Sequence, residues 1–176
     1  MRKYFEYASA NRTLLLTLTG TLVFLFLVFP NLPIGGEMLD VKPGYTHTEV
    51  MAAMDDYGAE GRSIYAWSSG VLDTLLFPLI YVTLFAGMIY RFRPTEGMWL
   101  LAFVPVIAGI WDVGENAQII VMLVQYPDIG ETQVAWASAS TSIKGYLVFI
   151  CLFLGLGLPS LAVSRRLLAK LKATIR

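Results

Sequence analysis

Two carboxylates and a carboxamide interrupt an otherwise apolar stretch of this sequence. Asp112, Glu115 and Asn116 stand at positions i, i+3 and i+4, so a helix would place all three on one face. Charged side chains are costly in a segment of membrane-spanning length unless they are paired, solvated or used in function. We therefore expect other segments to bring polar residues to this face. The candidates are Asp73, Lys144, Arg62, Tyr65 and Ser69.

Closely spaced carboxylates on one helix suit general acid–base chemistry. Asp112 would then be the deeper proton carrier and Glu115 its more solvated partner. Asn116 and Lys144 would orient a substrate or stabilise developing negative charge. Together with Asp73 the two carboxylates also offer the oxygen ligands that magnesium and calcium prefer. The Asp-x-x-Glu spacing is a weak signal for either chemistry, so we assign no catalytic residue, no metal and no cofactor.

The composition is that of a polytopic membrane protein. Apolar residues make up 56% of the 176 residues and charged residues 15%, whereas soluble domains have about 45–50% and about 25%. Four apolar runs approach or exceed the ~20 residues that a spanning helix needs. They predict an all-α bundle of four transmembrane helices in a single integral membrane domain, 1–176. The spans would cover about residues 13–30, 71–90, 98–124 and 139–162.

The basic residues predict the topology of these spans. Ten of the thirteen lysines and arginines flank the same end of the predicted helices. The positive-inside rule then gives a multi-pass protein of the plasma (cytoplasmic) membrane with both termini in the cytoplasm. The basic stretch from Arg165 to Arg176 is either an amphipathic helix on the inner leaflet or a plain stop-transfer flank. The basic residues lack interleaved aromatics, so no nucleic acid is expected as a partner.

The long outer loop, residues 31–70, is predicted to contain an amphipathic helix. The pattern Thr46-His47-Thr48-Glu49 is a capping box, and apolar residues then follow at helical spacing. We expect a helix from about His47 to Tyr57, ended by Gly58 and Gly61. It would lie flat at the membrane interface or fold over the mouth of the bundle as a lid.

The second span is predicted to extend well beyond the membrane core, because the helical pattern begins near residue 62. Several polar residues share one face of this helix or lie close to it: Arg62, Tyr65, Ser69 and Asp73. Pro78 leaves the carbonyl of Thr74, one residue after Asp73, without its helical hydrogen-bond donor. We expect a kink there that widens the bundle beside the carboxylate.

These positions predict a polar pocket in the outer half of the bundle, open to the extracytoplasmic side. One interpretation is that the pocket binds a small amphipathic or lipid-like molecule, or is the site of a lipid-modifying acid–base enzyme. A second is that salt bridges such as Asp73–Lys144 and Glu115–Arg62 only lock helix register. A third is that the charged side chains form contacts between subunits, with another membrane protein or with a second copy of the chain. Proton or ion conduction is disfavoured, since no acidic relay continues below Asp112.

A set of polar motifs resembles a group of small four-helix membrane proteins without an established activity. The motifs are Gly58-Ala-Glu-Gly61-Arg62-Ser-Ile-Tyr65, Asp73 with Pro78 and Tyr81, Asp112-Val-Gly-Glu115-Asn116, and Thr141 with Lys144. The resemblance covers about residues 55 to 160 and implies only that these positions act together. The four-helix plan with buried acids is also similar in outline to the sterol-isomerase and sigma-2-receptor group, as an analogy of fold without matching motifs.

Overall fold

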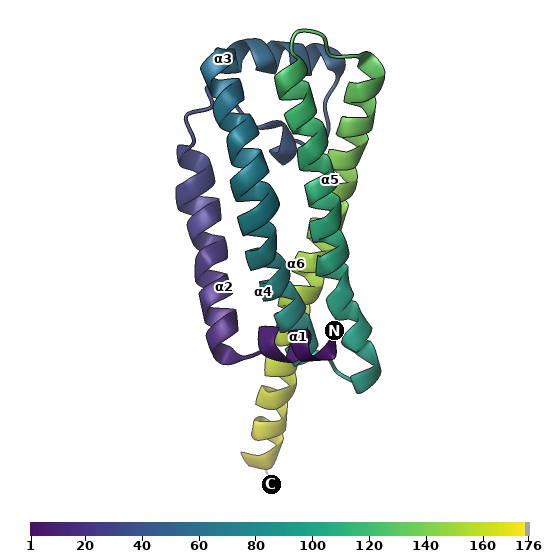
Figure 1. Cartoon of the computed structure of the whole chain (residues 1–176). Coiled ribbons are helices and arrows are strands. Elements are labelled where there is room, and N and C mark those ends of the chain that lie inside the picture. The colour runs from purple at the N-terminus through teal and green to yellow at the C-terminus, as the bar shows by residue number, and fades with distance from the viewer. Residues whose placement is uncertain (175–176) are drawn as a thin grey trace.

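The computed structural model describes residues 1–174, and this part of the chain is helical without strands. Four helical segments are long and apolar enough to cross a membrane, which confirms that part of the predicted architecture. They are Asn11–Asn31, His47–Phe92, Glu96–Gln125 and Glu131–Thr174. They stand side by side in one bundle, with both termini at the same end (Figure 1). We call this the termini end and the opposite one the lid end.

The first of these segments lies at the edge of the bundle. It consists of α2 (Asn11–Val23), a π-helical turn (Phe24–Val28) and a 3-10 turn (Phe29–Asn31). It packs along α4 (Phe77–Phe92) and leaves most of its own surface exposed. This agrees with the absence of charged residues between positions 13 and 30, since such a surface can face lipid directly.

A short helix that the sequence pattern did not predict lies across the termini end. This α1 (Arg2–Ala8) buries Phe5 completely beneath the bundle, where its ring packs against Tyr90 and Phe103. Arg91 donates a hydrogen bond to the carbonyl of Ser9 and so holds the chain between α1 and α2. A single buried aromatic anchors this helix, which is too short to show an apolar period in the sequence.

The lid helix, which we define as residues 47–57, is the first part of α3 (His47–Val71) and runs across the lid end of the bundle (Figure 1). Thr46 and Glu49 form the predicted capping box. Gly58 has φ +61° and turns the chain downward, and helix resumes at once. A residue with a side chain is strained at this φ, so glycine is suited to the corner. The expectation that Gly61 also ends the helix was wrong.

Gly61 instead lets the outer loop cross α3 at close range. A Cβ at Gly61 would lie 2.0 Å from the carbonyl oxygen of Ile34. The crossing brings the loop and its 3-10 turn (Leu39–Val41) onto the bundle. The hydroxyl of Tyr65 fixes the turn, because it accepts a hydrogen bond from the backbone nitrogen of Leu39 at 2.8 Å.

Two further long segments, like the first with its Pro30, change helix type beside prolines. A π-helical turn (Leu72–Leu76) joins α3 to α4, and Pro78 stands in the first turn of α4. The predicted kink near Asp73 therefore takes the form of a π turn that contains the carboxylate. In the third segment a 3-10 helix (Glu96–Phe103) precedes α5 (Val104–Gln125), again with a proline in the first turn of the α-helix. Proline cannot donate the backbone bond of a regular α-helix, which accounts for both changes.

The last helix, α6 (Glu131–Thr174), packs most closely on α5 and also on α4. It continues past the bundle at the termini end (Figure 1), where residues 164–174 are exposed. The predicted basic segment is thus helical through Thr174. Its last two residues, 175–176, lie outside the described part of the chain.

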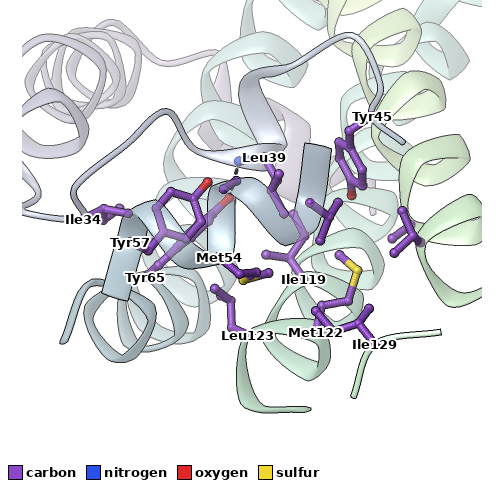
Figure 2. Packing of buried hydrophobic residues seen from close by; sticks show 14 residues of the cluster. Ile34, Leu39, Tyr45, Met54, Tyr57, Tyr65, Ile119, Met122, Leu123 and Ile129 are labelled. Atoms are coloured by element: carbon purple, nitrogen blue, oxygen red, sulfur yellow. Dashed lines mark hydrogen bonds between the residues drawn. The ribbon is translucent and has the colours of Figure 1, made fainter. Parts of the chain in front are cut away.

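The largest apolar core lies directly under the lid helix (Figure 2). Met54 and Tyr57 of the lid helix are buried there against Tyr65 of α3 and against Ile119 and Met122 of α5. The two tyrosine rings meet edge to face with centroids 5.6 Å apart. The lid helix is therefore packed as a core element and does not hang over the bundle as a loose flap.

The crossing at Gly61 gives a test of this packing. We expect Gly61→Ala to lower the free energy of unfolding by about 1–3 kcal/mol, because the added methyl group collides with rigid backbone. Gly145→Ala in α6 is the matched control, since no atom lies within 4 Å of a Cβ there. Thermal unfolding in detergent micelles measures both variants. Equal unfolding temperatures for the two would contradict the close crossing.

Candidate functional site

Lys144 of α6 joins the two carboxylates of α5. Its ammonium nitrogen lies 3.3 Å from Oδ1 of Asp112 and forms a second ion pair with Oε2 of Glu115. All three side chains are buried, Glu115 completely. Burying charges in a bundle is tolerable only when they are paired and hydrogen-bonded. The structure therefore brings together the acidic pair of the opening motif and the lysine predicted to meet it.

Neutral hydroxyls complete the hydrogen bonding of both carboxylates. Tyr81 of α4 donates to Oδ2 of Asp112 at 3.0 Å, and Thr141 of α6 donates to Oε1 of Glu115 at 2.6 Å. The hydroxyl of Tyr45, in the outer loop, lies 3.2 Å from that of Thr141. Burial raises the pKa of Tyr45 to about 12, so this hydroxyl stays neutral at ordinary pH. The cluster thus reaches from α4 through α5 and α6 to the outer loop.

Asn116 binds the backbone at the π-helical turn. Its Nδ2 donates to the carbonyl oxygen of Asp73 at 2.7 Å. Its Oδ1 is buried and has no hydrogen-bond partner among residues 1–174. Asp73 is only 8% exposed, and no lysine or arginine in the described residues forms an ion pair with it. Within the described residues Asp73 therefore does not form the predicted salt bridge with Lys144, which pairs with Asp112 and Glu115 instead.

A cavity of about 550 Å³ lies beside this cluster. Its charged lining residues come from four elements: Asp40 from the outer loop, Asp73 from the π-helical turn, Asp112 from α5 and Lys144 from α6. The rest of its wall is mainly apolar and comes from α2 and the two turns after it, α4, α6 and the loop: Thr21, Leu25, Phe29, Pro30, Met38, Val41, Phe77, Tyr81, Phe85, Val148 and Leu152.

Asp40 is the functional candidate that sequence reasoning missed. It stands in the 3-10 turn of the outer loop, and Tyr65 donates a hydrogen bond to its Oδ1 at 2.5 Å. Nothing in the local sequence distinguishes Asp40 from the other acids of the loop. Only the crossing of the loop over α3 brings it to the cavity. The structure thus assigns Tyr65 the role of holding Asp40 in place.

Two predicted site residues lie elsewhere. Arg62 donates to the carbonyl of Met54 at 2.7 Å, and its guanidinium lies 4.4 Å from the ring centroid of Tyr126. It closes the corner of α3 on the outer surface and forms no ion pair with Glu115. Ser69 is buried one turn before the π-helical segment but does not line the cavity. Sharing a helix face with Asp73 therefore does not bring Arg62 to the cavity, because Arg62 stands eleven residues earlier, about 16 Å along the helix at 1.5 Å per residue.

The described residues, 1–174, contain no group of three or more histidine, cysteine or acidic side chains arranged to hold a metal ion. Chemically, the cluster offers one ammonium that two carboxylates already engage, and two further carboxylates toward the cavity. Such a set can hold a polar or charged ligand group beside an apolar wall.

No protein-family model, curated protein or solved structure matches this chain. The functional proposal therefore rests on the cavity and the side chains that line it.

The central position of Lys144 can be tested by its removal. We expect Lys144→Met to lower the free energy of unfolding by about 3–5 kcal/mol, since it leaves two buried carboxylates without a cation. Adding Glu115→Gln should recover part of this loss. Thermal and denaturant unfolding in micelles provide the measurement.

Lys42→Met is the matched control, because Lys42 forms an ion pair 3.8 Å long with an exposed partner, Glu37. Removing a surface pair of this kind should cost about 0–1 kcal/mol. If the two lysine variants lose the same stability, Lys144 does not neutralise buried charge.

Proposed function

We propose that this protein binds a small amphipathic or lipid-like molecule in the cavity between α2 and α6. The cavity is the observation that carries the proposal, because it combines about 550 Å³ of space with a few charged groups in a mainly apolar wall. Small-molecule pockets are typically about 300–1,000 Å³ and have this mixture of lining residues. A wholly structural salt-bridge cluster would not need such a space beside it.

Three helices line the cavity with residues spaced four apart. α2 and the turns after it contribute Thr21, Leu25 and Phe29; the π-helical turn and α4 contribute Asp73, Phe77, Tyr81 and Phe85; α6 contributes Lys144, Val148 and Leu152. Residues at this spacing form a continuous stripe along a helix. From Lys144 to Leu152 the stripe is about 12 Å long at 1.5 Å per residue. The charged residues lie toward the lid end, so the wall suits a molecule with a polar head and an apolar body.

The surface beside the cavity supports entry from the bilayer. Leu25 is 46% exposed and Leu152 is 41% exposed, although both line the cavity. α2 packs along α4, and no comparable packing joins it to α6. The mouth therefore opens between α2 and α6, on the flank of the bundle. The packed lid helix and the outer loop cover the lid end itself, so a molecule dissolved in the membrane has the more direct route.

The orientation in the membrane is part of the same proposal. We take residues 1–176 as a single integral membrane domain of the plasma membrane, with the termini end in the cytoplasm. Most of the described basic residues support this, because they stand in α1, at the start of α2, around the end of α4 and in the last part of α6, which all lie at the termini end (Figure 1). The charged part of the cavity would then stand toward the extracytoplasmic leaflet, and the lid helix would cover the extracytoplasmic face.

Filling the cavity tests the proposal. We expect Val148→Trp to abolish retention of an amphiphile by the purified protein, because the larger indole side chain would fill the cavity that Val148 lines. Phe149→Trp is the control, since Phe149 is the next residue on α6 and is 67% exposed. Mass spectrometry of lipid extracts from equal amounts of folded protein measures retention. If wild type retains no more of any amphiphile than Val148→Trp, the proposal fails.

A further inference from the structure

We propose that the polar end of the bound molecule is a cation, in the form of a protonated amine. This inference rests on the proposed function and adds the chemical class of the ligand. It comes from the charges that face the cavity and from the absence of a cation beside two of them.

The cavity wall carries more acidic side chains than basic ones. Three carboxylates line it, from Asp40, Asp73 and Asp112, against the single ammonium of Lys144. Lys144 is already engaged, because it forms ion pairs with Asp112 and with the fully buried Glu115. Asp40 and Asp73 therefore form no ion pair with a lysine or arginine within the described residues.

Asp73 is the position where a ligand cation is needed most. Its side chain is almost fully buried, lines the cavity and has no ion-pair partner in residues 1–174. An unpaired carboxylate in such an environment is costly. An ammonium group supplies both the missing charge and three hydrogen-bond donors, which suits a wall that offers several acceptors.

Aromatic residues next to Asp73 strengthen the argument for a cation. Phe77 and Tyr81 follow it at four-residue spacing and line the same cavity, with ring centroids 5.1 Å apart. The faces of aromatic rings attract cations and do not attract anions. An anionic headgroup would instead meet like charges at Asp40, Asp73 and Asp112, which costs binding energy. The same geometry therefore disfavours phosphate-bearing and carboxylate-bearing amphiphiles without a compensating cation.

The experiment compares three amphiphiles that differ only in their polar group. Full-length protein in phosphatidylcholine nanodiscs is titrated with dodecylamine, dodecanol and dodecanoate, and binding is measured from the rise in unfolding temperature that a ligand of the folded state produces. We expect dodecylamine to bind wild type at least tenfold more tightly than dodecanol, and dodecanoate to bind most weakly. A tenfold ratio is the low end of what one charge-assisted hydrogen bond provides.

Substitutions at Asp73 test whether this residue causes the preference for the amine over the alcohol. Asp73→Asn should bring the amine-to-alcohol ratio close to one, whereas Asp73→Glu, which keeps the charge, should retain a preference. Asp128→Asn is the matched control, because it removes an exposed carboxylate at the lid end. Its ratio should equal that of wild type, which also excludes an effect of the amine on the bilayer alone.

The outcomes separate the two proposals. Equal binding of the three amphiphiles, or a preference for the anion, would overturn the cation inference and leave the amphiphile pocket intact. An amine preference that survives in Asp73→Asn would also overturn the inference. If none of the three binds any variant, both the inference and the proposed function fail.

Discussion

The ion pairs of Lys144 with Asp112 and Glu115 are the interaction on which the arrangement of the bundle depends. A buried ammonium and two buried carboxylates are stable only together, so they fix the rotation and register of α6 against α5. That rotation also places Val148 and Leu152, four and eight residues after Lys144, on the cavity wall. The structural reading of the salt bridges and the pocket reading are thus complementary, since the same pairing builds one side of the pocket.

Departures from regular helix geometry position the remaining side. The π-helical turn at residues 72–76 carries Asp73, and Asn116 binds the carbonyl oxygen of that residue. The corner at Gly58 and the crossing at Gly61 bring the outer loop, with Asp40, over the bundle. The π-helical turn loses regular α-helical hydrogen bonds, and the corner and the crossing require glycine. All three lie beside the cavity or beside the lid helix and outer loop that cover it. Irregular backbone inside a membrane bundle is tolerated where protein or a cavity surrounds it.

Much of the fold follows from the sequence, because apolar runs, the capping box and prolines are local signals. The meeting of Asp112 and Glu115 with Lys144 was also predictable, since buried charges must find partners. Tertiary geometry decided the rest. Arg62 lies away from the cavity because contacts at the corner of α3 hold its side chain, and Asp40 lines the cavity through a loop crossing with no sequence signature. The apolar wall of the cavity could not be predicted, because a leucine that faces lipid and a leucine that faces a cavity have the same sequence pattern.

The central claim is that an amphiphile occupies the space between α2 and α6. Photo-crosslinking with a long-chain amphiphile that carries a diazirine on its chain, followed by peptide mass spectrometry, tests this most directly. The account predicts adducts concentrated at Leu25, Val148 and Leu152, and their loss in Val148→Trp. Adducts that are as frequent at the exposed Phe149 and Phe153, with no change in Val148→Trp, would show contact with bulk lipid only and contradict the account.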